Sequence, residues 1–231
     1  MNGNLGVYFH IPFCRSKCAY CDFCSTAKWD DKYMDAYLEA LIRQLGDFFL
    51  PGGSYTVDTV YIGGGTPTVL DEKQLGALLA RITSHVDPAT LLEFSLEAGR
   101  PDTITEEKLS VLKAHRVSRI SVNPQTMSDA VLEEIGRKHT ASDVLSALSL
   151  VRRVGGFSIN MDLIAGLTGD SAAGFQSTLD TVLELRPENI TVHTLSRKKG
   201  SRVTKEQKKI PGPEEVSVML DYAMAELRAS D

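Results

Sequence analysis

Hydrophobic residues along the chain follow two alternating patterns. Short runs rich in β-branched and aromatic residues recur six times, and longer segments with apolar residues spaced three and four apart separate them. The short runs are typical of buried strands, and the longer segments are typical of amphipathic helices. The pattern predicts six strands, at residues 7–11, 57–62, 91–96, 119–122, 157–164 and 189–195.

The predicted helices carry signals at their ends. Apolar spacing from Tyr33 to Phe48 marks the first helix, and Pro51-Gly52-Gly53 would terminate it. Side chains that can accept hydrogen bonds from a first helical turn precede the later helices. The predicted N-caps are Asp71, Thr105, Ser128, Ser142 and Ser171, and we expect the last helix at residues 213–228.

Strict alternation of strands and helices predicts a parallel sheet. Parallel neighbours need a crossover connection, which a helix normally provides and which is right-handed. Eight such units close a full barrel, whereas this chain has six. We therefore expect an α/β fold, a partial (β/α)6 TIM-like barrel with outer helices, with a doubly wound sheet as the alternative. In both architectures, ligands bind beyond the carboxyl ends of the strands.

Composition limits the classes of partner. The 231 residues carry a net charge of -5 and 42% hydrophobic residues, which suits one sizeable core and disfavours a polyanion-binding surface. We expect a single domain over residues 1–231 and no nucleic-acid partner. Without a secretory signal or a run of about 20 apolar residues, we expect a cytoplasmic protein with no membrane span. The basic run at residues 197–202 indicates either a solvated loop or a site for an anionic molecule or partner.

All four cysteines lie within eleven residues, directly after the first predicted strand. Cysteines this close together, with none elsewhere, indicate metal ligands more than a disulfide framework. Cys14, Cys18 and Cys21 can each hold one iron of a [4Fe–4S] cluster and leave the fourth iron without a protein ligand. A zinc site that also uses Cys24 is the alternative. If Cys14, Cys18 and Cys21 hold a cluster, Cys24 is a bystander or a further functional thiol.

Glycines and polar residues stand where later strands end. Gly63-Gly64-Gly65-Thr66-Pro67-Thr68 follows the second strand, where glycines either allow close approach to a ligand or form only a tight turn. A carboxylate in an apolar strand needs a partner, which a loop, an arginine or a ligand can supply. His10 is predicted to orient the cysteine loop by a hydrogen bond, with a role as a ligand as the alternative. His193 would face the same mouth, with an ordinary structural histidine as the alternative. The strand-end side chains that need a partner are Glu97, Gln125 and Asp162.

The run from Tyr8 to Phe23 resembles the radical S-adenosylmethionine (SAM) superfamily, and within it the oxygen-independent coproporphyrinogen III oxidase group. The glycine motif and residues 95–102 and 121–127 extend this resemblance, which covers residues 8–195. It implies that SAM chelates the open iron of a [4Fe–4S] cluster held by Cys14, Cys18 and Cys21, and that reduction releases a 5′-deoxyadenosyl radical. The resemblance further implies SAM contacts from Tyr8, Tyr20, Gly64, Gly65, Thr66, Glu97, Gln125, Arg137 and Asp162.

Several of these implied roles have alternatives. Arg137 matches an arginine that pairs with a SAM carboxylate, but an exposed arginine at a helix end would fit the same position. For Tyr20, simple packing is the alternative. Members of the group often carry a further cysteine two residues after the third, where this chain has Phe23, so Cys24 could be its shifted counterpart.

The resemblance implies an oxidoreductase that converts two propionates of coproporphyrinogen III to vinyl groups by oxidative decarboxylation, giving protoporphyrinogen IX. Its partners would be a porphyrinogen-like small molecule and, as electron donor, flavodoxin or ferredoxin. A haem-binding chaperone of the same family is the alternative. Members of the group continue into a C-terminal domain, whereas this chain stops at Asp231, so we expect the core domain alone.

Overall fold

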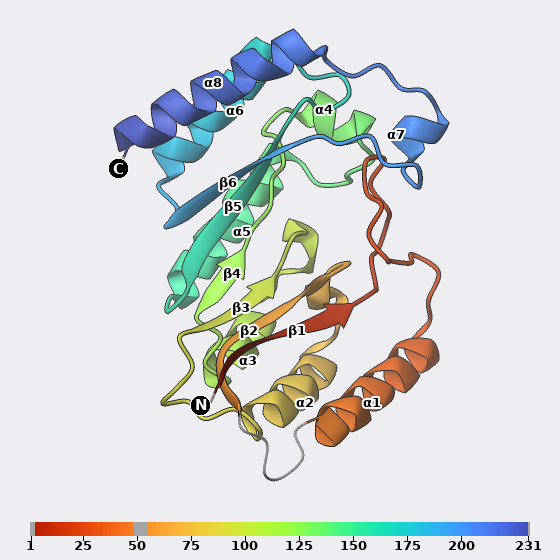
Figure 1. Cartoon of the computed structure of the whole chain (residues 1–231), viewed down its shortest axis with the longest axis vertical. Helices are drawn as coiled ribbons and strands as arrows, with labels where there is room; N and C mark the ends of the chain where they lie inside the picture. Colours follow the sequence, from red (N-terminus) through yellow and green to blue (C-terminus); the bar gives the residue numbers. More distant parts are fainter. Residues whose placement is uncertain (1–2, 49–54, 231) are drawn as a thin grey trace.

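The computed structural model describes residues 3–48 and 55–230. Six parallel strands form one sheet in the order β1-β2-β3-β4-β5-β6, which is their order along the chain (Figure 1). All six predicted strands are confirmed, with ends displaced by at most four residues. The strands are β1 (Gly3–Ile11), β2 (Tyr55–Gly64), β3 (Glu93–Glu97), β4 (Arg119–Ser121), β5 (Ser158–Ala165) and β6 (Asn189–Thr194).

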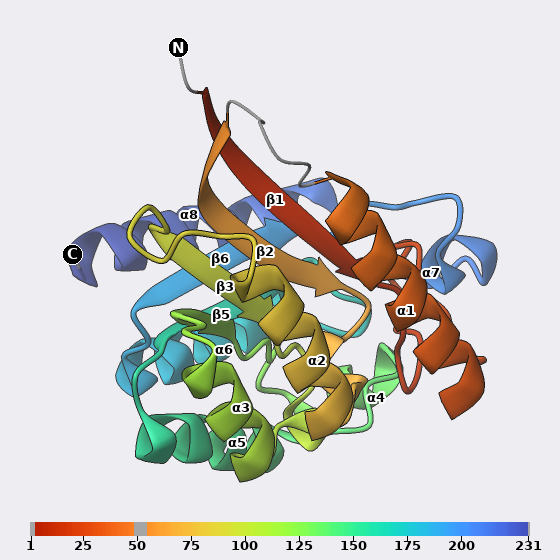
Figure 2. The same cartoon turned by 90° about the horizontal axis from the view of Figure 1, so that it is seen from below.

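Helices connect the strands along the outside of the curled sheet (Figure 2). A doubly wound sheet requires the strand order to reverse, and the sequential order seen here rules that alternative out. The partial (β/α)6 barrel is therefore confirmed. Its helices are α1 (Asp31–Phe48), α2 (Glu72–Thr83), α3 (Glu106–Ala114), α4 (Asp129–Glu134), α5 (Ala141–Val154), α6 (Ala172–Leu185), α7 (Arg202–Lys205) and α8 (Pro213–Ser230), with short 3-10 turns η1 (Pro67–Val69) and η2 (Pro101–Thr103).

Four of the five predicted N-caps are confirmed, namely Asp71, Thr105, Ser128 and Ser171. The prediction for Ser142 is wrong, because Thr140 caps α5. Thr140 and Asp143 form a capping box in which each side chain accepts a hydrogen bond from the other residue's backbone N–H. The turn predicted at Pro51-Gly52-Gly53 lies outside the described residues, and the last helix extends two residues beyond its predicted end.

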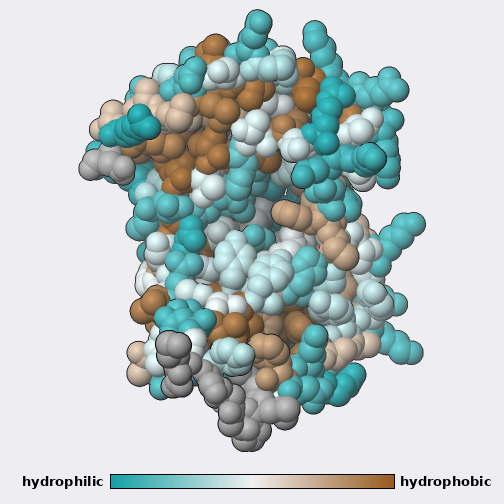
Figure 3. All heavy atoms as spheres, viewed as in Figure 1, coloured by the Kyte–Doolittle hydropathy of each residue, from teal (hydrophilic) through white to brown (hydrophobic). Residues whose placement is uncertain are grey.

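The hydrophobic core lies between the outer face of the sheet and the helices. Alternate residues of the strands point toward it, including Phe94, Leu96, Ile120, Ile159 and Met161, each at most 2% exposed. Hydrophobic residues also gather on the surface beside α8 and β6 (Figure 3), where β6 forms an open edge of the sheet. Among the described residues, the helices are all too short or too polar to cross a bilayer.

Candidate functional site

A cavity of about 430 Å³ opens at the carboxyl ends of the strands. Eleven of the twelve predicted site residues line it. Tyr8 does not, but its ring stacks at 5.9 Å on Tyr61, which does. The structure thus brings together residues that the sequence spreads over about 150 positions. The predicted residues that line the cavity are Cys14, Cys18, Tyr20, Cys21, Gly64, Gly65, Thr66, Glu97, Gln125, Arg137 and Asp162.

Three of the four cysteines of the cysteine loop line this cavity. Cys14 and Cys18 are buried and Cys21 is half-buried, whereas Cys24 is exposed and is not among the lining residues. Hydrogen bonds hold the loop in place, since Cys14 N–H donates to Thr26 O at 3.0 Å and Ala19 N–H donates to Ile135 O at 2.8 Å. Within residues 3–48 and 55–230, no three His, Cys, Asp or Glu side chains are already arranged to hold a metal ion.

His10 orients the cysteine loop, as its sequence position predicted. Its Nε2 lies 2.7 Å from the Cys24 carbonyl oxygen, and its Nδ1 lies 3.0 Å from the Tyr8 hydroxyl. Because a carbonyl oxygen can only accept, Nε2 carries the proton and Nδ1 accepts from Tyr8. The imidazole therefore links β1 to the far end of the loop without being a ligand of anything in the cavity.

The glycine motif packs directly against the cysteine loop, so it is more than a tight turn. A Cβ at Gly65 would lie 2.5 Å from the Phe13 carbonyl oxygen and 3.0 Å from Cys14 Sγ. Gly64 has a φ of +113°, a backbone conformation that side chains with a Cβ rarely adopt. The buried Thr66 hydroxyl lies 3.7 Å from Cys14 Sγ. Only glycine lets these two segments approach so closely.

Arg137 is buried in the site, so the alternative of an exposed helix-end arginine is wrong. Gly136 ends α4 with a φ of +74° and turns the chain inward, because its N–H and that of Arg137 bond to the last carbonyls of the helix. The guanidinium donates to Gly99 O at 2.9 Å, to Asn123 O at 2.7 Å and to the Tyr20 hydroxyl at 3.1 Å. This anchorage holds the guanidinium in the cavity wall.

Arg100 is a site residue that our sequence analysis did not single out. It is buried and donates to both Cys18 Sγ and Ser16 O at 2.9 Å. Burial by itself would raise the pKa of the Cys18 thiol, but the charges of Arg137 and Arg100, together with hydrogen bonds from Tyr20 and Arg137, lower that pKa on balance. The two arginines therefore favour the thiolate, the form of cysteine that binds metals.

Gln125 reaches the site through a strained backbone. Its φ is +70°, which is uncommon outside glycine, and the strain costs on the order of 1 kcal/mol. Two hydrogen bonds to β5 impose this conformation, since Gln125 N–H donates to Asp162 O at 2.9 Å and Ile164 N–H donates to Gln125 O at 3.0 Å. The side chain is thereby placed at the end of the sheet, where it lines the cavity.

Three buried polar atoms around the cavity have no hydrogen-bond partner among the described residues. They are Gln125 Oε1, Asn123 Oδ1 and Arg137 Nε. Unpaired buried polar groups are rare because each costs about 1–3 kcal/mol. Two acceptors and a cationic donor around one cavity fit a ligand that carries both amino and carboxylate groups.

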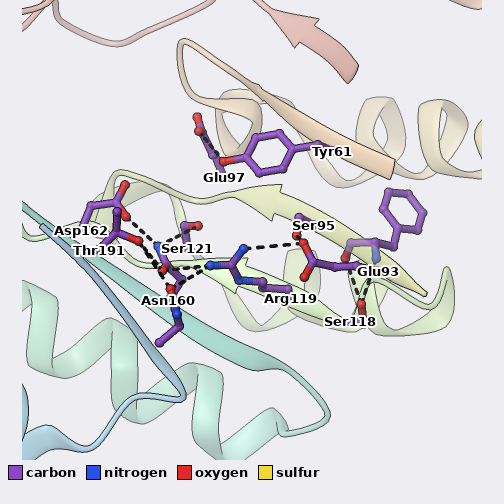
Figure 4. Close-up of polar contacts among 12 residues, drawn as sticks. Tyr61, Glu93, Ser95, Glu97, Ser118, Arg119, Ser121, Asn160, Asp162 and Thr191 are labelled. Carbon is purple, nitrogen blue, oxygen red and sulfur yellow. Dashed lines mark hydrogen bonds and ion pairs between the residues drawn. The ribbon is translucent and has the colours of Figure 1, made fainter. Parts of the chain in front are cut away.

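The inner face of the sheet forms a polar wall of the same cavity (Figure 4). Arg119 donates to the side-chain oxygens of Asn160 and Asn189, both at 3.0 Å, and lies 3.5 Å from the Glu93 carboxylate. The Asn160 amide nitrogen donates to an Asp162 carboxylate oxygen at 2.6 Å. Because Arg119 can only donate, the Asn160 oxygen must face it, which directs the amide nitrogen to Asp162.

Asp162 therefore has a protein partner other than the loop or arginine that the sequence suggested. Its second carboxylate oxygen lies 3.9 Å from His193 Nε2, and His193 also lines the cavity, as its strand phase predicted. The Asp162 side chain is 20% exposed. One carboxylate oxygen is thus fixed by Asn160, and the other is directed toward His193 on the neighbouring strand.

Glu97 and Tyr61 point toward each other from neighbouring strands (Figure 4). The Tyr61 hydroxyl donates to Glu97 Oε1 at 2.7 Å. Burial raises the pKa of Glu97, although the Tyr61 hydrogen bond opposes this effect. Burial and the Glu97 carboxylate also raise the pKa of Tyr61 above its usual value. Tyr61 remains a neutral donor at neutral pH, and it holds Glu97 at the end of β3.

The polar wall could have been found from strand alternation. Successive strand residues point to opposite faces, so the positions between the core residues share the inner face. Those positions are polar in the four neighbouring strands β3 to β6. The lining residues of this wall that the sequence analysis did not predict are Tyr61, Arg119, Ser121, Asn160 and Thr191. Glu93 adjoins them through its ion pair with Arg119. Arg100 lies in a loop and offered no comparable signal.

Comparison with protein families identifies the class to which this fold and site belong. The family model described as the radical SAM superfamily matches residues 8–182. The chain belongs to this superfamily, and within it to the oxygen-independent coproporphyrinogen III oxidase-like family. Membership implies SAM and a [4Fe–4S] cluster as cofactors.

Individual relatives carry two different names. The chain is 40% identical over 228 residues to the oxygen-independent coproporphyrinogen-III oxidase-like protein HemZ of Bacillus subtilis, covering 96% of this chain and 45% of the relative. It is 38% identical over 196 residues to heme chaperone HemW of the same organism, covering 82% of this chain and 50% of HemW. The chain thus spans about half the length of these relatives.

The fold has a close counterpart among solved structures. Coproporphyrinogen III oxidase (HemN) from Escherichia coli superimposes with a TM-score of 0.88 at 27% sequence identity, and the match covers 99% of this chain and 53% of HemN. The partial barrel described here therefore corresponds to about half of that enzyme.

Proposed function

We propose that this chain is a radical SAM core in which Cys14, Cys18 and Cys21 hold a [4Fe–4S] cluster. The observation that carries the proposal is that these three cysteines line one cavity together with Gln125 and Arg137, each of which has an unpaired buried polar atom. Three thiolates leave one iron of a cubane free for an outside ligand. When bound, the cluster would supply the electron that cleaves SAM and yields a 5′-deoxyadenosyl radical.

The chain's own residues would bind and orient SAM. Arg137 suits the SAM carboxylate, because its planar guanidinium is held rigidly and retains an unpaired Nε. Glu97 and Asp162 offer carboxylate oxygens to ribose hydroxyls, and Gln125 offers an amide oxygen to an amino group. The backbone near Gly65 can approach the methionyl amino group, since no side chain intervenes.

Tyr8, Tyr20 and Thr66 support this arrangement from the edge of the cavity. The Tyr20 hydroxyl accepts from Arg137 at 3.1 Å and so fixes the guanidinium. Tyr8 bonds His10 and stacks on Tyr61, which ties the cysteine loop to the cavity wall. Thr66 and Gly64 hold the glycine motif against the loop, so that cluster and SAM would share one rigid frame.

The proposed reaction is the oxidative decarboxylation of coproporphyrinogen III to protoporphyrinogen IX, in haem biosynthesis. The similarity to an oxidase-like protein over 96% of the chain and to E. coli coproporphyrinogen III oxidase over 99% supports it. The core domain at residues 1–231 would act in the cytoplasm and receive electrons from flavodoxin or ferredoxin. The comparable similarity to HemW makes haem binding the second candidate function.

Reductive SAM cleavage tests the proposed site. The protein is reconstituted anaerobically with iron and sulfide, treated with dithionite and SAM, and assayed for 5′-deoxyadenosine. We expect this product from the unmodified protein and from Cys24→Ala, whose thiol lies outside the cavity, but not from Cys18→Ala. A protein that stays colourless and iron-free, or a Cys18→Ala variant that keeps the full rate, would contradict the cluster assignment.

The two candidate functions give different products. Anaerobic incubation with coproporphyrinogen III, SAM and a reductant should yield protoporphyrinogen IX and carbon dioxide if the chain is an oxidase. A saturable Soret shift on haem titration, without conversion of the porphyrinogen, would favour the chaperone. Both measurements use the same reconstituted protein, so a failure of cluster assembly would show in its iron content before either result is interpreted.

A further inference from the structure

The segment at residues 197–209, called here the basic segment, concentrates positive charge in an acidic protein. It carries seven basic residues and one acidic residue, whereas the whole chain has a net charge of -5. Six of the seven are exposed, and the seventh, Lys208, is half-buried and pairs with Glu134 at 2.7 Å. The exposed residues are Arg197, Lys198, Lys199, Arg202, Lys205 and Lys209.

This charge is not neutralised within the described part of the chain. None of the six exposed basic residues forms an ion pair with a described acidic residue. The adjoining cysteine loop adds the exposed Lys17, whose ammonium group donates to Phe23 O. Like charges gathered on one surface repel each other, so a surplus of this kind indicates an acidic partner better than an internal structural role.

The basic segment is anchored to the outside of the cysteine loop. Val203 and Ser201 are each 1% exposed, and Val203 N–H donates to Ala19 O at 3.0 Å. The Arg202 guanidinium donates to Lys17 O at 3.3 Å. Figure 1 shows α7 beside this loop, and the same corner of the molecule is hydrophilic in Figure 3. Positive charge is therefore fixed on the residues that flank Cys18.

We propose that the basic segment docks a small acidic electron-transfer protein, with a one-electron flavin or iron–sulfur centre. This rests on the proposed function, which requires one electron from outside for each SAM cleaved. A donor seated on α7 would lie against the backbone that carries Cys18 and Cys21, which keeps the electron's path short. One electron passes from donor to cluster, so the donor is oxidised and the cluster reduced by one electron, with no atom or proton transferred.

Charge reversal separates donor docking from SAM cleavage itself. The variant Lys198→Glu/Lys199→Glu is compared with Lys32→Glu/Lys73→Glu, which makes the same charge change at exposed positions on α1 and next to the α2 N-terminus. Binding of oxidised flavodoxin is measured at about 50 mM and about 300 mM salt, because screening weakens surface attraction. Formation of 5′-deoxyadenosine is then measured with reduced flavodoxin and, separately, with dithionite.

We expect the 198/199 variant to raise the flavodoxin Kd about tenfold or more at low salt and to slow flavodoxin-driven cleavage, while dithionite-driven cleavage stays unchanged. The 32/73 control should match the unmodified protein. Unchanged flavodoxin binding, or an equal loss with dithionite, would overturn the docking proposal. Absence of dithionite-driven cleavage in the unmodified protein would instead overturn the proposed function, so the two failures are distinguishable.

Discussion

The two faces of the sheet are built from neighbouring residues of the same strands, yet the outer face is apolar and buried and the inner face is polar. On the outer face, Phe94 and Ile120 are almost fully buried against the helices. One residue along each strand, Glu93 and Arg119 form an ion pair on the inner face (Figure 4). A period of two is enough to separate a face that packs against the helices from a polar face that lines the cavity.

The inner face shows what opening the barrel does to its interior. In a closed (β/α)8 barrel, inward side chains are bulky and apolar and fill the interior as layers. Here six strands leave the interior accessible, and polar side chains line a cavity there instead. The outer face therefore supplies most of the stability, and the inner face orients polar groups at a modest cost in stability.

Truncation of an outer-face residue should have the largest effect. Phe94→Ala is expected to lower the free energy of unfolding by about 3–5 kcal/mol, because it leaves a cavity in the core. Ser95→Ala, one residue along on the inner face, removes only a hydrogen bond to Glu93 and should cost less than about 1.5 kcal/mol. Urea unfolding followed by circular dichroism measures both, and equal costs would contradict the division between the faces.

A buried polar group outside the cavity should make stability depend on pH. His139 is 4% exposed, and neither ring nitrogen has a partner among the described residues. Burial, with Arg137 and Arg100, lowers its pKa to about 4. Below pH about 6.5 the unfolded chain binds a proton that the folded chain does not, so stability falls as the pH drops from about 6.5 toward about 4.

Between pH 7 and pH 5 this contribution amounts to about 2 kcal/mol. Urea unfolding across that pH range should therefore show a steeper decline for the unmodified protein than for His139→Gln, which cannot titrate. Because other groups titrate in both proteins, the difference between their slopes is the quantity to compare. Parallel slopes would mean that His139 is protonated equally in the folded and unfolded states.

Removing the guanidinium beside the cysteine loop should change the electronic properties of the proposed cluster. In the unmodified protein, the positive charge of Arg100 and its hydrogen bond to Cys18 Sγ would stabilise the reduced cluster. Arg100→Gln removes both the charge and the charged donor. We expect its midpoint potential to fall by about 60 mV, equivalent to about 1.4 kcal/mol for one electron. Potentiometric titration monitored by electron paramagnetic resonance measures the shift.

Arg15→Gln is the matched control for this potential. Arg15 lies on the cysteine loop, but it is exposed and pairs with Asp102. Its potential should stay within error of the unmodified protein. If Arg100→Gln and Arg15→Gln shifted the potential equally, overall charge and not the hydrogen bond to Cys18 would be responsible.

The smallest expected effect comes from the inner-face network. Asn160→Ala removes the amide that holds Asp162, and we expect the Kd for SAM to rise about fivefold, or about 1 kcal/mol. Equilibrium dialysis of the reconstituted protein measures it. Asn189→Ala is the control, because Asn189 also accepts from Arg119 but makes no contact with Asp162. Equal affinities in the two variants would mean that Asp162 needs no support from Asn160.

Much of the architecture could be read from the chain because it depends on local patterns. Strand and helix periodicity, the caps at Asp71 and Ser171, and the spacing of Cys14, Cys18 and Cys21 are all local. Errors arose where two local signals compete, as at α5, where Thr140 with Asp143 forms a better cap than Ser142. Local signals also predicted the carboxyl ends of the strands as the place where ligands bind.

Hydrophobic period and motif spacing are properties of neighbouring residues, so the order of strands and helices, the family and most residues around the cavity follow from the chain alone. The hydrogen bonds from Arg100 to Cys18, from Asn160 to Asp162, and from the basic segment to Ala19 depend on the folded arrangement and could not be predicted from the chain. The first and third contacts join residues from different elements, and the second depends on the orientation of the Asn160 amide. The curvature of the sheet and the paths of its loops set these contacts, and neither can be derived from local sequence patterns.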